Sequence, residues 1–143
     1  MRAGVAAALM LATLLIGGCS GATVAATSGP TAASAPAAGS SLSASDFAAA
    51  TKLPDTVLLD VRTPSEFSAG HITGAVNIDV ESATFPQLVA TLDPAKNYAI
   101  YCRSGSRSKV AMTAMGQAGF SHLFDLAGGI GAWQSAGGQL VTG

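Results

Sequence analysis

The chain has 143 residues, a formal net charge of −1 and 10% charged residues, so its electrostatics give no case for a nucleic-acid partner. Its length suits one domain, and its two cysteines, Cys19 and Cys102, are too few for a disulfide framework. No cluster of cysteine and histidine has the spacing of metal ligands, so the sequence predicts no metal site.

The N-terminus has the composition of an export signal. Arg2 precedes an apolar run over residues 5–16, which is too short to span a bilayer but suits a signal peptide over residues 1–18. The following Ile-Gly-Gly-Cys resembles a bacterial lipobox, which implies cleavage before Cys19 and lipidation of its thiol. The alternative is an ordinary signal cleaved near residues 24–26. In both cases we expect an exported protein, lipid-anchored to the outer face of the cell membrane or periplasmic.

Residues 19–41 contain mainly Ala, Ser, Thr, Gly and Pro, with no aromatic and no charged side chain. Such a segment lacks the apolar side chains of a core, so it predicts a disordered tether behind the lipid anchor. About 22 flexible residues reach roughly 25 Å, which would lift a domain off the lipid surface. Residues 42–143 hold all the aromatic residues and form the predicted domain.

Short apolar strands alternate with helices in this domain. The predicted strands cover residues 57–59, 75–78, 98–101 and 122–126, and the predicted helices cover residues 45–50, 84–92, 106–118 and 130–136. A further helical turn begins with Thr63 as N-cap and Pro64 at its first position. In the helix over residues 106–118, one face is expected to carry Val110, Ala111, Ala114 and Met115, and Gly119 stops the helix. This alternation predicts an α/β domain with a mainly parallel sheet.

Cys102 follows the third predicted strand and precedes a short Gly/Ser loop and a helix. Backbone N–H groups converge in such a turn, and two nearby arginines add positive charge, so the thiolate is favoured. The basic cluster of Arg103, Arg107 and Lys109 suits a small anion. The sequence therefore predicts a reactive cysteine that handles an anion; the alternative is a small buried core residue.

Asp60 and Arg62 follow a neighbouring predicted strand, so we expect them at the same sheet edge as the cysteine loop. A supporting role suits this pair better than a chemical one. Arg107 has a structural alternative, in which it pairs with Asp60 or Glu66. The other polar or aromatic candidates are assigned structural roles or none: a turn contact for His71, core packing for Trp133, and nothing for His122.

Three blocks of the domain resemble a single-domain rhodanese, or thiosulfate sulfurtransferase. They are residues 59–67 continuing to 70–78, residues 101–108, and residues 126–129 with Trp133. The resemblance implies the rhodanese-like α/β fold, with a mainly parallel central sheet flanked by helices. It implies Cys102 as the catalytic residue, Asp60 and Arg62 as supporting residues, and a substrate-binding loop of Arg103, Ser104, Gly105, Ser106, Arg107 and Ser108.

The implied reaction is sulfur transfer through a persulfide on Cys102, and it requires no metal or organic cofactor. Thiosulfate or a similar small anion is the expected donor, and cyanide, an external thiol or a thioredoxin-like protein is the expected acceptor. A monomer is expected, which contacts the membrane through its lipid anchor alone. An alternative is a non-enzymatic module that binds a partner or senses redox state through Cys102. A phosphatase or arsenate reductase is disfavoured, because four residues separate Cys102 from Arg107 where phosphatases of similar fold have five.

Overall fold

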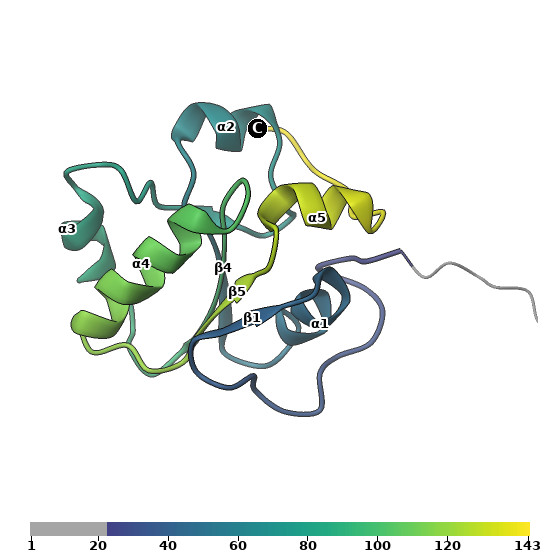
Figure 1. Ribbon diagram of the computed structural model, residues 1–143, viewed down its shortest axis with the longest axis horizontal. Coiled ribbons are helices and arrows are strands. Elements are labelled where there is room, and N and C mark those ends of the chain that lie inside the picture. The colour runs from purple at the N-terminus through teal and green to yellow at the C-terminus, as the bar shows by residue number, and fades with distance from the viewer. Residues whose placement is uncertain (1–22) are drawn as a thin grey trace, which may run out of the picture.

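The computed structural model describes residues 23–143, so the predicted signal peptide and Cys19 lie outside the described residues. One sheet holds five strands: β1 (Ser40–Leu42), β2 (Thr56–Asp60), β3 (Val76–Asn77), β4 (Asn97–Tyr101) and β5 (Leu123–Leu126). The strand order is β1-β5-β4-β2-β3, and all neighbouring strands are parallel (Figure 1). The predicted α/β class with a mainly parallel sheet is confirmed.

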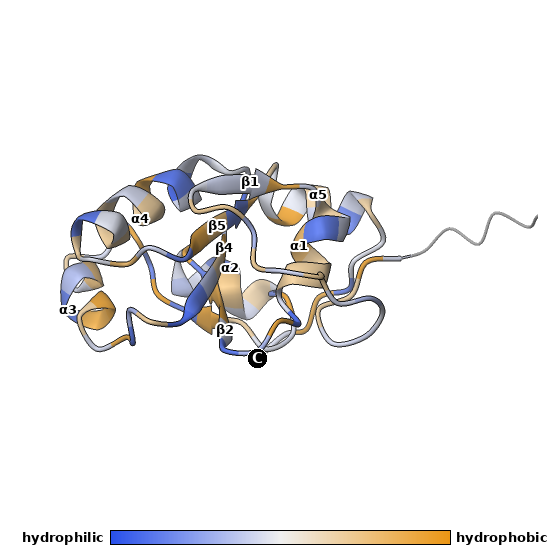
Figure 2. Ribbon diagram, turned by 90° about the horizontal axis from the view of Figure 1, so that it is seen from below, coloured by the Kyte–Doolittle hydropathy of each residue, from blue (hydrophilic) through white to orange (hydrophobic). Residues whose placement is uncertain are grey.

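The chain forms five helices in the described residues: α1 (Ala44–Ala50), α2 (Pro64–Ala69), α3 (Phe85–Val89), α4 (Ser106–Gln117) and α5 (Gly129–Ser135). Helices α1 and α5 cover one face of the sheet, α3 and α4 cover the other, and α2 lies beyond one edge (Figure 1). Alternate residues of β4 face two separate clusters of apolar side chains. Ala99 and Tyr101 join the cluster formed with α1 and α5, whereas Tyr98, Ile100 and Cys102 join the cluster formed with α3 and α4. Figure 2 shows the apolar strands between these two pairs of helices. The central strands are therefore buried on both faces, as their continuous apolar runs indicate.

Local signals set two of the helix ends as expected. Thr63 caps α2, with Pro64 in the first turn, and Glu66 completes a capping box with the Thr63 side chain and backbone. Helix α4 ends at Gln117, and Gly119 follows with a φ of +96°, a conformation that glycine adopts without strain.

Three details of the helices differ from prediction. Helix α1 begins at Ala44, one residue before the predicted start, because the Ser43 side chain caps it. Helix α3 ends at Val89, and the chain continues in tighter turns to Leu92. In α4 the buried stripe is Ser108, Ala111 and Met115, whereas Val110 is 60% exposed. Because Ser108 is polar, the apolar pattern of the sequence did not show which face of α4 is buried.

The described part of the predicted tether packs partly on the domain. Strand β1 pairs with β5, so the fold begins before residue 42. Val24 is buried, and its N–H group lies 3.3 Å from the carbonyl of Ala136. The N–H group of Ala32 likewise donates to the carbonyl of Ala49. A segment of small residues has no hydrophobic periodicity. Its backbone N–H and carbonyl groups can still form hydrogen bonds with the free edge of a strand or the end of a helix. Within residues 23–143, none of the helices has the length and apolar character needed to cross a bilayer.

Candidate active site

The carboxyl ends of β2 and β4 bring the predicted site residues to one edge of the sheet. The two strands are parallel neighbours, with Asp60 in register with Tyr101. Arg62 and Cys102 therefore both emerge at this edge, which faces α2 and the start of α4 (Figure 1). This is the side of a parallel sheet where ligands bind, and the prediction that the two segments meet here is confirmed.

The loop after β4 curls around the Cys102 sulfur. Gly105 precedes α4 in a left-handed conformation, with a φ of +103°, which turns its N–H group back toward the loop. This N–H lies 3.0 Å from the Cys102 sulfur, and the Ser108 hydroxyl oxygen lies 3.8 Å from it. Cys102 is 1% exposed and its thiol is free. The sulfur thus sits in a cradle made of its own loop and the first turn of α4.

The cradle favours the ionised thiol. Burial raises the pKa of Cys102, but the backbone N–H groups of Ser108, Gly105 and Ser104 lower it, and the pKa ends below its ordinary value. The N-terminal end of the twelve-residue α4 adds its partial positive charge to the same spot. A thiolate held by N–H donors is a nucleophile, so the structure does not support a purely structural core cysteine.

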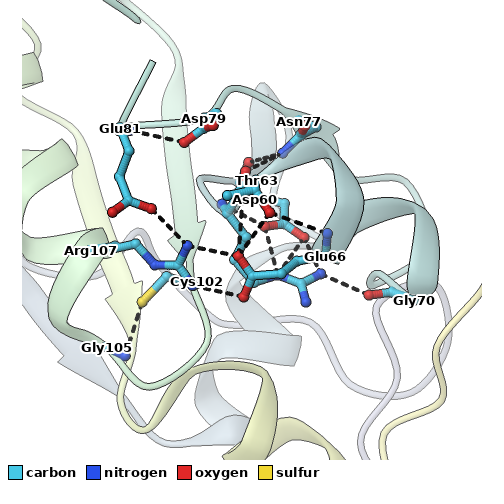
Figure 3. A network of polar contacts seen from close by, with 11 residues as sticks. Asp60, Thr63, Glu66, Gly70, Asn77, Asp79, Glu81, Cys102, Gly105 and Arg107 are labelled. Atoms are coloured by element: carbon cyan, nitrogen blue, oxygen red, sulfur yellow. Dashed lines mark hydrogen bonds and ion pairs between the residues drawn. The ribbon is translucent and has the colours of Figure 1, made fainter. Parts of the chain in front are cut away.

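Arg107 clamps the loop to α2. Its two terminal nitrogens each lie 2.8 Å from a different carboxylate oxygen of Glu66, and one lies 3.2 Å from Glu81. Figure 3 shows the guanidinium between these carboxylates, beside the loop that carries Cys102. The hydrogen bonds from Arg107 lower the pKa of Glu66 to about 2. Two carboxylates around one arginine leave little net positive charge here, which favours the structural alternative for Arg107 over an added positive potential.

Asp60 and Arg62 form a buried ion pair under α2. Their side chains are 0% and 6% exposed, and the shortest nitrogen–oxygen distance is 2.6 Å. Arg62 also donates to the carbonyl of Gly70, at 2.7 Å, which ties the end of α2 to the sheet. Both charges are satisfied inside the protein, an arrangement that suits the supporting role expected of this pair.

Arg103 is exposed, in contrast to Arg107. It lies on a groove of about 310 Å³ between α2 and α5, whose other lining residues are Arg62, Glu66, Ala69, Gly70, Ile130, Gln134 and Leu140. Ser104 and Ser106 are exposed as well, whereas Gly105 and Ser108 are buried. The groove therefore offers one unengaged guanidinium and an apolar wall beside the cysteine loop.

The turn before α5 supports the back of the loop. Ile130 donates its N–H to the carbonyl of Cys102 at 2.9 Å. A Cβ atom on Gly129 would lie 2.5 Å from the backbone of Arg103, and the φ of Gly129 is +61°. Close backbone contact and the positive φ thus explain why a glycine stands at position 129.

His71, Trp133 and His122 lie apart from the chemistry. The ring of His71 stacks on Phe67 at 3.7 Å, and its Nδ1 lies 2.9 Å from the Phe67 carbonyl. Trp133 is buried in the core, and its indole donates to the carbonyl of Gln139. His122 is exposed. Across residues 23–143, no group of three or more His, Cys, Asp or Glu side chains is arranged to hold a metal ion.

Sequence reasoning missed two acidic residues near the loop, Glu81 and Asp125. Asp125 interrupts the apolar run of β5 and is fully buried, where it accepts a hydrogen bond from Ser108. A charged residue inside an otherwise apolar buried strand signals a polar partner, so this residue was detectable. Glu81 lies in a loop before α3 with no pattern around it.

Curated relatives include proteins named for sulfur transfer. The chain is 34% identical over 88 residues to a sulfurtransferase of Allochromatium vinosum, which covers 62% of this chain and 80% of that protein. It is 37% identical over 89 residues to thiosulfate sulfurtransferase 16 of Arabidopsis thaliana, covering 55% and 74%. A tRNA uridine(34) hydroxylase of Teredinibacter turnerae also matches at 38% identity, but only 25% of that protein is covered.

The fold has solved counterparts. A rhodanese-related protein of Thermoplasma volcanium has a TM-score of 0.64 and 31% identity, and the match covers 73% of this chain and 99% of that one. The family model for the rhodanese-like domain matches residues 43–136, which contain the whole cysteine loop, the Asp60–Arg62 pair and the turn before α5. With its five-stranded parallel sheet and cysteine cradle, the chain belongs to the family of rhodanese-like domain proteins.

Proposed function

We propose that this protein is a sulfurtransferase, which moves the outer sulfur of thiosulfate or a similar donor to a thiophilic acceptor through a persulfide on Cys102. The observation that carries the proposal is the contact between the Gly105 N–H and the Cys102 sulfur, at 3.0 Å, inside a loop of converging N–H groups. The names of two relatives support it, since both are called sulfurtransferases.

In the first step the Cys102 thiolate attacks the outer sulfur of thiosulfate. A sulfur–sulfur bond forms to Cys102, the bond to the sulfonate sulfur breaks with its electron pair, and sulfite leaves. The product is an anionic persulfide, so the total charge is unchanged. Loop N–H groups that stabilise the thiolate also suit this anion. Arg103, exposed beside the loop, is the guanidinium free to orient the sulfonate oxygens.

In the second step an acceptor removes the outer sulfur and Cys102 leaves as the thiolate. Cyanide would yield thiocyanate, and a thiolate would yield a new persulfide. No second cysteine is present among the described residues, so the acceptor comes from outside the domain. The groove between α2 and α5, at about 310 Å³, has room for an acceptor larger than a small inorganic anion.

We also propose that the protein is exported with Cys19 lipidated, on the strength of the apolar run and the lipobox-like tetrapeptide. Because Val24 already packs on the domain, four residues separate Cys19 from the fold. The fully extended distance from Cys19 to Val24 is about 17 Å, shorter than the reach expected of a free tether. Mass analysis of the mature N-terminus tests this: a diacylated Cys19 supports it, and an unmodified N-terminus near residues 24–26 contradicts it.

The test of the function is steady-state transfer of sulfur from thiosulfate to cyanide by the full chain, with Cys102→Ser as the matched variant. We expect thiocyanate from the wild type and none above background from the variant. A folded wild type without turnover, for thiosulfate and for other sulfane donors, would reject the proposal. In that case, reversible oxidation of Cys102 by peroxide would favour the redox-sensing module.

A further inference from the structure

A buried acid lies behind the cysteine loop, and the proposed mechanism does not use it. Asp125 in β5 is 0% exposed. Its Oδ2 accepts from the Ser108 hydroxyl at 2.6 Å and lies 3.5 Å from the Lys109 ammonium. Its Oδ1 accepts from the hydroxyl of Ser41 in β1, which lies 2.9 Å from the same ammonium. All of these partners donate to Asp125, which suits an ionised carboxylate.

Ser108 stands between this carboxylate and the catalytic sulfur. Its hydroxyl oxygen lies 2.6 Å from Asp125, 3.0 Å from the carbonyl of Gly105 and 3.8 Å from the Cys102 sulfur. A hydroxyl has one proton to donate. The carbonyl and the ionised carboxylate only accept, and the 2.6 Å distance is typical of a charge-assisted O–H···O⁻ bond. The proton is therefore committed to Asp125, and an oxygen lone pair is left for the sulfur.

From this geometry we propose that Asp125 is a positioning residue, which holds the Ser108 hydroxyl proton away from Cys102. The thiolate is then stabilised by backbone N–H groups, and the hydroxyl accepts from the thiol instead of donating to the thiolate. The other charged groups around the loop are Arg103, Arg107 and Lys109 from the chain after Cys102, Glu66 from α2, and Glu81. Of all these charged side chains, Asp125 is the one whose side chain hydrogen-bonds to the Ser108 hydroxyl.

This arrangement has a consequence for sulfur transfer, which rests on the proposed function. Cys102 must attack the donor in the first step, and a thiolate that is stabilised further becomes a weaker nucleophile. An added hydrogen bond from Ser108 would stabilise it further. Because Asp125 holds the Ser108 proton, the Cys102 thiolate is stabilised by the backbone N–H groups alone and keeps more of its nucleophilicity.

The test measures the thiol directly, with no sulfur donor present, so it is independent of whether the protein transfers sulfur. The full chain carries Cys19→Ser, which leaves Cys102 as its one thiol. Alkylation by iodoacetamide is followed across pH by intact mass. Asp125→Asn keeps the shape of the side chain: its oxygen would accept from Ser41, and its amide would donate to Ser108. The Ser108 proton would then be shared between the Gly105 carbonyl, at 3.0 Å, and the Cys102 sulfur, at 3.8 Å.

We expect Asp125→Asn to alkylate several-fold faster than its parent at pH values below the titration of the thiol. The gained hydrogen bond raises the thiolate fraction about tenfold, and the lower nucleophilicity of that thiolate offsets part of the gain. Removing the negative charge of Asp125 also changes the electrostatic potential at the Cys102 sulfur directly. Asp125→Asn is therefore also made in a protein that carries Ser108→Ala. The acceleration should largely disappear in that background. An equal acceleration in both backgrounds, or none in either, would overturn the proposal.

Ser108→Ala alone is the second arm, and it decides the question even if Asp125→Asn does not fold. If the hydroxyl proton is committed to Asp125, the alkylation rate at low pH should change less than about twofold. A several-fold slower rate would show that the hydroxyl already donates to the thiolate, and would overturn the proposal. Cooperative thermal melting verifies that each variant is folded.

Discussion

The clamp between α2 and the cysteine loop predicts a stability difference that depends on pH in a defined direction. Glu66 receives two hydrogen bonds from Arg107, and its pKa falls from 4.5 to about 2. A carboxylate whose pKa is lower in the folded than in the unfolded protein stabilises the fold at pH values above its unfolded-state pKa. This contribution is lost as the pH falls toward the folded-state pKa. Glu66→Gln removes the charge and keeps the size, so it isolates this contribution.

The size of the effect follows from the pKa shift and the exposure of the pair. Taken alone, the shift corresponds to about 3 kcal/mol. The side chains of Arg107 and Glu66 are 23% and 29% exposed, so water screens part of it. We expect Glu66→Gln to lower the free energy of unfolding by about 1–2 kcal/mol at pH 7. The difference from wild type should shrink between pH 4.5 and 2, the two pKa values.

Urea unfolding of both proteins at pH 7, 4.5 and 3 measures this difference. Glu81→Gln is the matched control, because Glu81 makes one contact with the same arginine, at 3.2 Å, and its side chain is 62% exposed. It should cost no more than a few tenths of a kcal/mol. Equal costs for the two substitutions, or a Glu66→Gln cost as large at pH 3 as at pH 7, would contradict this prediction.

Three further substitutions probe the site. Arg62→Met leaves the buried Asp60 carboxylate without its partner, so we expect a loss of about 3–5 kcal/mol in the free energy of unfolding, measured by urea denaturation. Gly129→Ala forces a Cβ to within 2.5 Å of the Arg103 backbone at a positive φ; turnover should fall about tenfold, and wild-type turnover would show that the loop shifts freely. Arg103→Gln should raise the KM for thiosulfate about tenfold with a small change in kcat, and an unchanged KM would remove Arg103 from the donor site.

The placement of the site was predictable because it depends on chain order and strand direction. An apolar strand that ends in Cys102 and a parallel neighbour that ends at Asp60 must open at the same edge, whatever the details of packing. The cap at Thr63 was predictable because Thr, Pro and Glu stand at fixed offsets. These features are local or follow from the sheet's connectivity.

Features that depend on contacts between distant small residues were not predictable. Strand β1 is three residues long, and its pairing is set by the free edge of β5 rather than by its own sequence. The contact of Val24 with the end of α5 depends on the chain path between them. The buried face of α4 includes the polar Ser108. A prediction from apolar periodicity alone assigns polar positions to solvent, so it placed this face incorrectly.

If Cys102 carries the transferred sulfur, intact mass after exposure to thiosulfate alone detects it most directly. We expect a gain of one sulfur atom on the wild-type chain, located on the peptide that contains Cys102 and removed by added cyanide. Cys102→Ser should show no gain. A folded wild-type protein that gains no sulfur from thiosulfate or any other sulfane donor, or an adduct that survives cyanide, would contradict this mechanism.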